Sequence, residues 1–359
     1  MHAGNMFAIS ESPLSISPEQ LDDYLARGWF RMNQTIFTTH FLQFNNIFYS
    51  AIWLRIDIAR YVPDKNHRLA LKGIKAFRTE VQPAQITREH EVLYEKYKAG
   101  VAFESYSSLR QLLLANNTYS IYNTLQVNIY AGEDLIASGF FDTGKTSAQG
   151  IVCIYNPAFK KYSLGKCLIY TKIDYCRQNK LLYFYPGYTV PGYPAFDYKL
   201  QIGTQNMQYY NRSANMWAAF TTVHNMYKPL TDMYEKLFEL KTSLLSKKVS
   251  AKVLYYRFFD APLSITLWTN LLDYPVFLLP EIRQTTDITR IAVYNIAARQ
   301  YIYFECIPVY TVENPDNQST VFSSEVISIY KQLFATTNTD DMANAIIISC
   351  NEPPMYIAE

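Results

Sequence analysis

One stretch of the chain, residues 135–199, limits the possible folds more than any other. It begins with two apolar runs, Leu135–Phe141 and Gly150–Tyr155, separated by a turn rich in Gly, Lys, Thr, Ser and Gln. Two such runs around a polar turn predict a β-hairpin. The Asn156-Pro157 pair that follows is a turn signal and ends the second strand. The stretch therefore starts as two antiparallel strands.

A helix and a further strand follow the hairpin. Ser163 stands at a typical N-cap position, and apolar residues at helical spacing come after it. Leu181–Tyr185 is then a short apolar run of strand type, and Leu125–Tyr130 precedes the hairpin as an alternating strand. The order over residues 125–185 is thus a three-stranded meander, a crossover helix and a returning strand. A substrate can be presented at the N-terminus of such a helix.

Composition indicates a folded chain with a large core. Apolar residues make up 49% of the 359 residues and charged residues only 18%, which argues against disorder. This length predicts more than one domain. We expect an α+β fold with an N-terminal subdomain over residues 1–105, a core over 106–215 and an α+β extension over 216–359.

The remaining elements are predicted from caps, turns and periodicity. Residues 1–18 are expected to form an extended arm, Gly203–Asn215 a loop or linker, and Thr35–Tyr49 shows no clear period. Helices are predicted from Pro18 to near Gly28 and over Thr87–Tyr97, Ser107–Asn116, Pro229–Ser246 and Ser319–Phe334. Strands are predicted over Ser50–Ala59, in several runs between residues 251 and 311, and over Ala345–Ile348, with a turn at Asn314–Asn317.

Several classes of function lack their sequence signatures. The five cysteines form no CxxC pair, which suits a reducing compartment and indicates neither a disulfide framework nor a zinc site. The chain has no phosphate loop, dinucleotide fingerprint, HExxH or GxSxG motif. It also shows no signal peptide and no apolar run of about 18 residues. We therefore expect a cytoplasmic protein without a metal, a cofactor or a membrane span.

A basic segment stands out against the small net charge of +2. From Arg55 to Arg78 there are seven basic residues and two acidic ones. Most charged runs are solvated surfaces. The alternative is a local patch that contacts phosphates, since the chain as a whole does not attract polyanions.

The strand and helix order resembles a GNAT-type acyltransferase core. Such a core needs neither a metal nor a covalent intermediate, and catalysis rests on positioning and a proton acceptor. The acetyl-CoA pyrophosphate loop, (Q/R)xxGxG/A, is absent, and Ala158–Gly165 stands in its place. An ordinary CoA thioester is therefore not the expected acyl donor.

The motifs around this core resemble the arginyl-tRNA–protein transferase family, including its bacterial leucyl-transferring branch. Asp142, Tyr155, Pro157 and Ser163–Gly165 stand at the spacing of that family's Asp-Val-Leu-Pro, Phe-Tyr-Asp-Pro and Ser-Leu-Gly motifs. A later segment, from Tyr185 to Lys199, resembles its Tyr-x-Gly-Tyr-x-Ile and Cys-Pro-Lys-Met-x-Tyr-Lys run. The similarity extends over about residues 15–215.

The chain departs from the family pattern at several points. No cysteine precedes Cys153, so the family's N-terminal cysteine cluster is absent. Asn156 replaces the aspartate of the Asp-Pro pair, and Ala195 replaces the first lysine of the later motif. These departures bear on substrate identity more than on fold.

The resemblance implies transfer of arginine or leucine from an aminoacyl-tRNA ester to the N-terminal α-amine of an acceptor protein. The partners would be the charged tRNA, as co-substrate, and the acceptor, with no DNA and no membrane. Two alternatives stay open. One is a GNAT-type N-acyltransferase with another acyl donor, and the other is a non-catalytic GNAT-like scaffold that binds protein or RNA.

The resemblance also supplies candidate site residues. Asp142 either handles the attacking ammonium or caps the turn before Gly144, and Tyr155 either lines the acyl site or packs in the core. Lys199 is expected to contact a phosphate or a carboxylate. The other substrate-binding candidates are Ser163, Leu164, Gly165 and Lys166, with Lys160 and Lys161, for the tRNA 3′ end; Tyr188 and Tyr198 in the later motif; and Arg31, Arg68 and Lys72 for an acidic acceptor terminus or tRNA phosphate.

Overall fold

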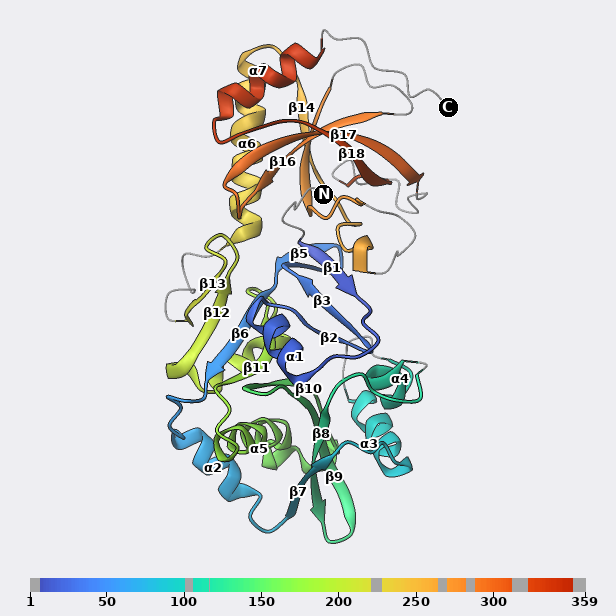
Figure 1. The fold of residues 1–359 in the computed structure, drawn as a ribbon, viewed down its shortest axis with the longest axis vertical. Helices are drawn as coiled ribbons and strands as arrows, with labels where there is room; N and C mark the ends of the chain where they lie inside the picture. Colours follow the sequence, from blue (N-terminus) through green and yellow to red (C-terminus); the bar gives the residue numbers. More distant parts are fainter. Residues whose placement is uncertain are drawn as a thin grey trace.

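The structure is a computed structural model that describes residues 7–100, 106–115, 117–220, 228–263, 270–281, 288–311 and 322–350. Figure 1 shows the two largest sheets near opposite ends of the long axis. The fold is α+β, with one mixed and several antiparallel sheets, as the sequence predicts.

The larger sheet has eight strands and contains the predicted meander. Its only parallel pair among the described strands is β10 with β11, and all its other pairs are antiparallel. The predicted order of three strands, a helix and a returning strand is confirmed. In spatial order the strands are β13 (Met216–Ala219), β12 (Met207–Asn211), β6 (Ile52–Asp57), β11 (Tyr183–Thr189), β10 (Ser147–Tyr155), β9 (Asp134–Thr143), β8 (Thr124–Ala131) and β7 (Arg78–Pro83).

Helices cover both faces of this sheet because successive strand residues point to opposite sides. Phe141 packs on one face beneath α5 (Leu164–Gln178) and α2 (Lys65–Gly73). Phe140 packs on the other beneath α3 (Arg88–Lys98) and α4 (Leu109–Leu114) (Figure 1). The helices α3, α4 and α5 are confirmed predictions, whereas α2 lies in the basic segment and was not predicted.

The N-terminal part adds a helix and two small sheets. Helix α1 (Pro18–Ala26) starts with the expected capping box between Ser17 and Gln20. The predicted arm contains a strand, and the segment without a clear period contains three, with Asn45 and Asn46 in left-handed conformations at a tight turn. These strands are β1 (Ala8–Glu11), β2 (Phe30–Met32), β3 (Thr35–Thr39), β4 (Phe41–Phe44) and β5 (Ile47–Ser50).

The C-terminal sheet has five antiparallel strands, covered by α6 (Pro229–Ser246) and α7 (Thr339–Cys350) (Figure 1). Its core includes Phe7, Phe41 and Phe48, so the N-terminal strands bury side chains against it. The domain boundaries drawn from the sequence stay predictions. In chain order the strands are β14 (Ala251–Tyr255), β15 (Val276–Pro280), β16 (Thr289–Asn295), β17 (Gln300–Thr311) and β18 (Glu325–Thr336).

Three predicted elements are wrong. Gly203–Asn215 is not a loop throughout, because its middle forms β12 beside β6. The helix predicted over Ser319–Phe334 is strand β18 in its described part, paired along β17. The strand predicted at Ala345–Ile348 belongs to α7. The turn predicted at residues 314–317 lies outside the described residues.

Candidate functional site

The parallel pair β10 and β11 opens into a cavity. The two strands pair only from Ser147 with Tyr183 to Gln149 with Tyr185. Beyond these residues both strands have register shifts against their other neighbours, and Gly187 adopts a left-handed conformation with φ of +91°. A cavity of about 160 Å³ lies where the strands diverge. Its lining consists of Tyr97, Gly150, Ile151, Val152, Cys153, Ile169, Lys172, Phe184, Pro186, Tyr198 and Lys199.

Lys199 places an ammonium in the wall of this cavity. The residue is 9% exposed, and its Nζ donates to the Tyr188 carbonyl oxygen at 2.8 Å. Nζ also lies 5.1 Å from the ring centroids of Tyr188 and Phe196, a cation–π arrangement. Burial lowers the pKa of Lys199 to about 8. An ammonium with one hydrogen bond to the described chain retains donors for an anionic ligand.

Lys172 brings a second ammonium to the cavity from α5. It is 1% exposed, and its Nζ donates to the carbonyls of Phe140 at 2.9 Å and Val152 at 3.1 Å. Its third contact is Cys153 Sγ at 3.3 Å. Burial lowers the pKa of Lys172. No carboxylate is among the described lining residues, so the two lysines make the cavity electropositive.

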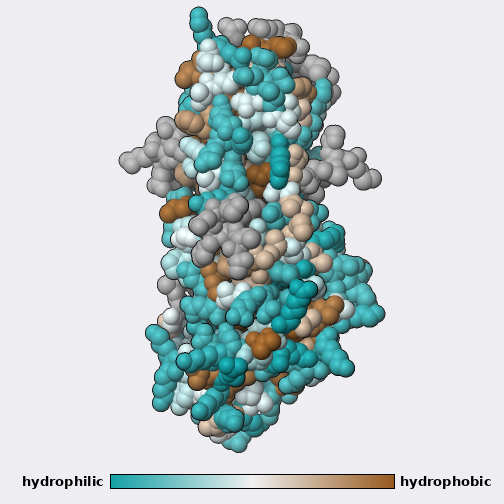
Figure 2. All heavy atoms as spheres, turned by 90° about the vertical axis from the view of Figure 1, so that its left-hand side faces the viewer, coloured by the Kyte–Doolittle hydropathy of each residue, from teal (hydrophilic) through white to brown (hydrophobic). Residues whose placement is uncertain are grey.

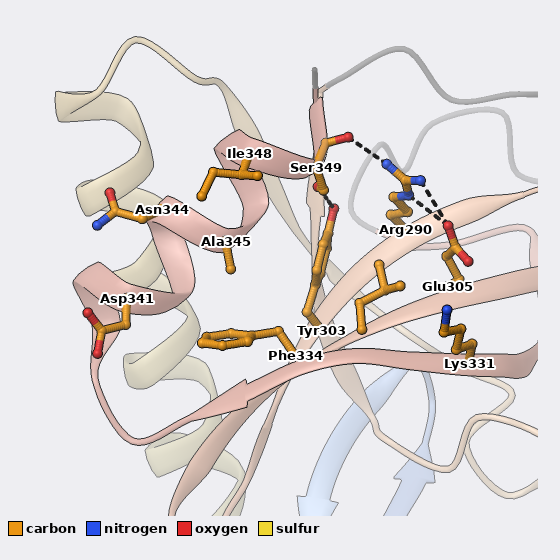
Figure 3. Close-up of a pocket in the computed structure, with 11 residues that line it drawn as sticks. Arg290, Tyr303, Glu305, Lys331, Phe334, Asp341, Asn344, Ala345, Ile348 and Ser349 are labelled. Atoms are coloured by element: carbon orange, nitrogen blue, oxygen red, sulfur yellow. Dashed lines mark hydrogen bonds and ion pairs between the residues drawn. The ribbon is translucent and has the colours of Figure 1, made fainter. Parts of the chain in front are cut away.

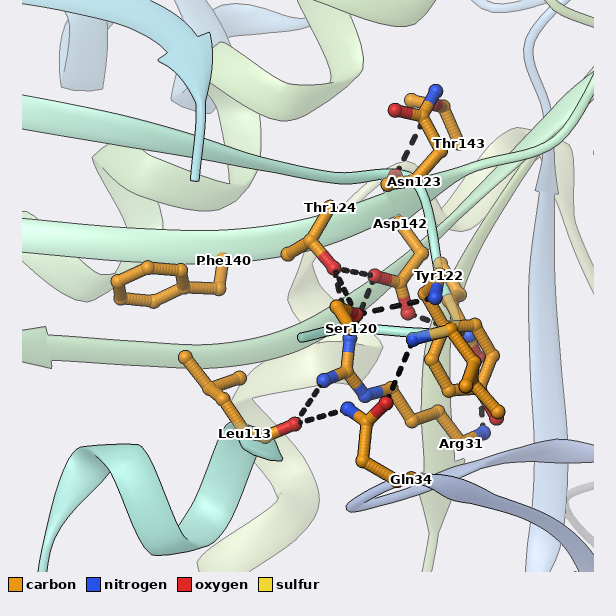
Figure 4. A network of polar contacts seen from close by, with 12 residues as sticks. Arg31, Gln34, Leu113, Ser120, Tyr122, Asn123, Thr124, Phe140, Asp142 and Thr143 are labelled. Carbon is orange, nitrogen blue, oxygen red and sulfur yellow. Dashed lines mark hydrogen bonds and ion pairs between the residues drawn. The ribbon is translucent and has the colours of Figure 1, made fainter. Parts of the chain in front are cut away.

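Asp142 forms a buried ion pair with Arg31 (Figure 4). Its Oδ1 accepts from Arg31 Nη1 at 2.8 Å and from Thr124 Oγ1 at 2.7 Å, while Oδ2 accepts from Gln149 Nε2 at 2.9 Å. The two side chains are 0% and 2% exposed. Burial raises the pKa of Asp142, and the Arg31 charge opposes this. The sequence thus named both partners but not their pairing.

This geometry bears on the two predicted roles of Asp142. The turn before Ser147 is held by Asp22 of α1, which accepts hydrogen bonds from Thr146 N and Ser147 Oγ. The alternative of a turn cap at Asp142 is therefore wrong. The catalytic role stays a prediction, although Asp142 does not line the cavity.

The residues predicted to bind the tRNA 3′ end lie at the start of α5 and differ in exposure and in their contacts. Ser163 is exposed and has a left-handed backbone conformation. It stands at the predicted N-cap position, but its side chain makes no capping hydrogen bond. Leu164 is 1% exposed within the core, so a substrate contact by its side chain is wrong. A Cβ at Gly165 would lie 3.3 Å from the Tyr155 ring, and Lys166 Nζ donates to Gln201 at 2.6 Å.

The tyrosines of the motifs surround the cavity. Tyr198 lines it, and Tyr188 supplies the carbonyl that holds Lys199. Tyr155 contacts the ring of Tyr97, another lining residue, edge-on at a centroid distance of 5.4 Å. Burial raises the pKa of Tyr97 to about 12, so its hydroxyl stays protonated at neutral pH.

Exposed basic residues gather at one side of the same sheet. Arg68 and Lys72 lie on α2, and Lys160 and Lys161 lie on the 3₁₀ helix η1 (Pro157–Tyr162). The two segments adjoin, because Phe77 after α2 contacts the ring of Tyr162 at 5.0 Å. Hydrophilic residues predominate on the lower part of the face shown in Figure 2. These four candidates lie at the surface, apart from the residues that line the cavity.

A larger cavity of about 510 Å³ lies between α7 and strands β16 to β18 (Figure 3). Two of its charged residues pair with each other: Arg290 Nη2 lies 2.9 Å from Glu305 Oε1, and Arg290 Nη1 donates to the Ser349 carbonyl at 2.6 Å. In the described residues no group of three or more His, Cys, Asp or Glu could hold a metal ion. No described helix is long and apolar enough to cross a bilayer.

Residues 89–209 match the family model described as arginine-tRNA-protein transferase, C terminus. The matched region contains all the described residues that line the cavity at the opened strands, and it leaves out Arg31, Arg68 and Lys72. The cavity at the opened strands therefore lies within the matched residues, and the larger C-terminal cavity lies outside them.

The curated relatives agree with this match. An aspartate/glutamate leucyltransferase of Leptospira interrogans is 25% identical over 192 residues, which cover 52% of this chain and 73% of the relative. The Vibrio cholerae protein of the same name is 27% identical over 199 residues, covering 54% and 82%. The family resemblance predicted from the sequence is thus confirmed for about half of the chain.

The similar solved structures are distant. The C-terminal domain of a putative lysylphosphatidylglycerol synthetase from Agrobacterium fabrum aligns with a TM-score of 0.32 and 13% identity. The alignment covers 39% of this chain and 47% of that one.

Proposed function

We propose that the protein is an aminoacyl-tRNA–protein transferase. It moves an amino acid from charged tRNA to the N-terminal α-amine of an acceptor protein, by direct attack of the amine on the ester. The observation that carries the proposal is the electropositive cavity between β10 and β11, which lies wholly within the region that matches the transferase family. The expected compartment is the cytoplasm, where charged tRNA is used.

The proposed fold of this region is GNAT-like. The support is the meander, crossover helix and returning parallel strand, together with the opening of that parallel pair. Beyond Gln149, the edge of β10 that faces β11 has no ladder partner among the described strands. Backbone groups at an unpaired edge can hydrogen-bond an ester carbonyl and hold it for attack.

The chemistry asks little of the enzyme beyond placement. The ester is already activated, and aligning it with the amine supplies most of the acceleration. An α-ammonium has a pKa of about 7.7–8.0, so a useful fraction is neutral near pH 7 without a strong base. The required site is a pocket that brings the ester and the amine together, and the cavity is the proposed place for this.

The charge of the cavity favours leucine over arginine as the transferred residue. Two lysines and no described carboxylate line it, so a guanidinium group would meet like charge in a medium of low polarity. The curated relatives are named as leucyltransferases. Apolar lining residues such as Ile151, Val152 and Phe184 suit a leucine side chain.

The same relatives are named for aspartate and glutamate. In this chain Lys199 is the group that fits an acidic acceptor residue, because its buried ammonium has donors to spare. The exposed Arg68, Lys72, Lys160 and Lys161 are assigned to the phosphates of the tRNA.

The test is transfer from charged tRNA to defined peptides. The purified chain is mixed with tRNA carrying labelled leucine or arginine and with a peptide that starts with Asp. Label should pass from leucyl-tRNA, and RNase or acetylation of the peptide terminus should prevent it. Lys199→Met should reduce transfer, whereas the matched control Lys252→Met, at an exposed residue of β14, should not. Labelling by a CoA ester without any transfer from charged tRNA would replace this proposal with an ordinary N-acyltransferase.

A further inference from the structure

Cys153 and Lys172 form a close pair in the wall of the cavity, and the proposed transfer reaction gives the thiol no role. Cys153 is half-buried and lines the cavity, whereas Cys167, Cys176 and Cys306 are buried. Lys172 Nζ lies 3.3 Å from its sulfur. Room for the lysine exists because residue 139 is glycine: a Cβ there would lie 3.0 Å from Lys172 Cε.

The lysine is confined as well as close. Its hydrogen bonds to the Phe140 and Val152 carbonyls tie Nζ to β9 and β10, the strand pair that carries Cys153. Two reacting atoms held near van der Waals distance in fixed orientation combine far more readily than the same groups in solution. The cavity gives a small oxidant access to the sulfur.

We propose that Cys153 and Lys172 are a peroxide-sensitive modification site, at which oxidation of the thiol leads to a covalent sulfur–nitrogen bond between the two side chains. Hydrogen peroxide is the oxidant. The product is a sulfenamide that crosslinks β10 to α5 and removes the lysine charge from the cavity.

The chemistry balances in two steps. First, the Cys153 sulfur attacks one peroxide oxygen: an S–O bond forms and the O–O bond breaks. The thiol becomes a sulfenic acid, and the peroxide is reduced to water. Second, the lone pair of the neutral Lys172 amine attacks the same sulfur: an N–S bond forms and the S–O bond breaks. The departing oxygen takes the proton that nitrogen loses and leaves as water.

The second step needs an unprotonated amine, which burial favours because it lowers the pKa of Lys172. Exchange with two equivalents of an external thiol would restore both side chains and yield a disulfide of that thiol. The next consequence rests on the proposed function. The crosslink would stop aminoacyl transfer, because the cavity would lose one of its two cations and its wall would be distorted.

The experiment treats the purified full chain with hydrogen peroxide and maps its peptides by mass spectrometry. We expect the peptides carrying residues 153 and 172 to appear joined, lighter by two hydrogens than their sum, and to separate on reduction. The crosslink should be absent in Cys153→Ser and Lys172→Met and present in the exposed-lysine control Lys180→Met.

The peptide map of the wild-type chain tests the crosslink even if a variant fails to fold. Overoxidation of Cys153 to the sulfinic acid without a crosslink, or an unmodified Cys153 when other cysteines react, would overturn the inference. Loss of transfer on peroxide treatment, restored by thiol, is the second readout. Absence of transfer from the untreated chain would count against the proposed function only, because the crosslink is measured independently.

Discussion

Changing Asp142 to Asn separates two explanations of this buried carboxylate. The substitution keeps the shape of the side chain and removes its charge. It leaves the Arg31 guanidinium, 2% exposed, without its only described anionic partner. The remaining Arg31 contacts within the described chain, to Thr124 Oγ1 and the carbonyls of Asn33 and Leu113, are with neutral groups.

The expected cost is about 3–5 kcal/mol in the free energy of unfolding, the range for removal of one partner of a buried ion pair. The Asp142→Asn and Arg31→Met double variant should cost less than the sum of its parts by about 1–3 kcal/mol, because no unpaired buried charge remains. The control Asp134→Asn, on the exposed start of β9, should change stability by less than about 0.5 kcal/mol.

Urea unfolding followed by tryptophan fluorescence measures these differences. Trp53 is a suitable reporter, since it is 2% exposed and stacked on Phe30 at 3.9 Å in the same half of the chain. A stable Asp142→Asn variant, within about 1 kcal/mol of wild type but inactive in transfer, would refute the structural explanation. The carboxylate would then act in the reaction, as first predicted from the motif.

Three further outcomes are expected. Burial lowers the pKa of Lys199 to about 8, so its cationic form is lost as pH rises through that value. The preference for peptides that start with Asp over peptides that start with Asn, measured as the ratio of their kcat/KM values, should therefore fall above pH 8. The Lys199→Met variant should show no such fall. Alanine at Lys160 or Lys161 should each reduce the slope of log affinity for tRNA against log salt by about 0.7–0.9, measured by filter binding. Gly144→Ala should destabilise the chain by about 1–3 kcal/mol in urea, because its Cβ would overlap a carboxylate on α1 and approach the Pro18 carbonyl to 3.0 Å, whereas Gly73→Ala, with open space around it, should not.

The fold was predictable where local signals agree with the final packing. The hairpin, α5 and β11 were found because apolar period, turn and cap point to the same elements. The parallel pairing of β10 and β11 then follows from the crossover helix between them. Segments without such agreement failed: Thr35–Tyr49 contains strands whose tight turn uses Asn45 and Asn46 instead of glycine.

The C-terminal errors have a common cause. Short segments rich in isoleucine fit both the helical period of about 3.6 residues and the strand period of two, so tertiary pairing decides between helix and strand. In β18 a long ladder with β17 imposes the strand. In α7, Asn338 caps the helix by accepting from the backbone of Asp340 and Asp341, and Met342 and Ile346 fall on one buried face.

In the candidate site, too, the residues with a sequence signal were predictable and those without one were not. The motif predicts Tyr198 and Lys199, which do line the cavity, whereas no motif distinguishes Lys172 from the other lysines of its helix. Its position was informative: it follows Leu168 by four residues and precedes Ile173, both fully buried, so it lies on the inward face of α5. A buried lysine needs acceptors, and these are main-chain carbonyls of Phe140 and Val152 at the β10 bulge. Gly150 marks the bulge, since an isolated glycine within a strand often does, but residue type does not show which carbonyls a bulge turns toward a lysine.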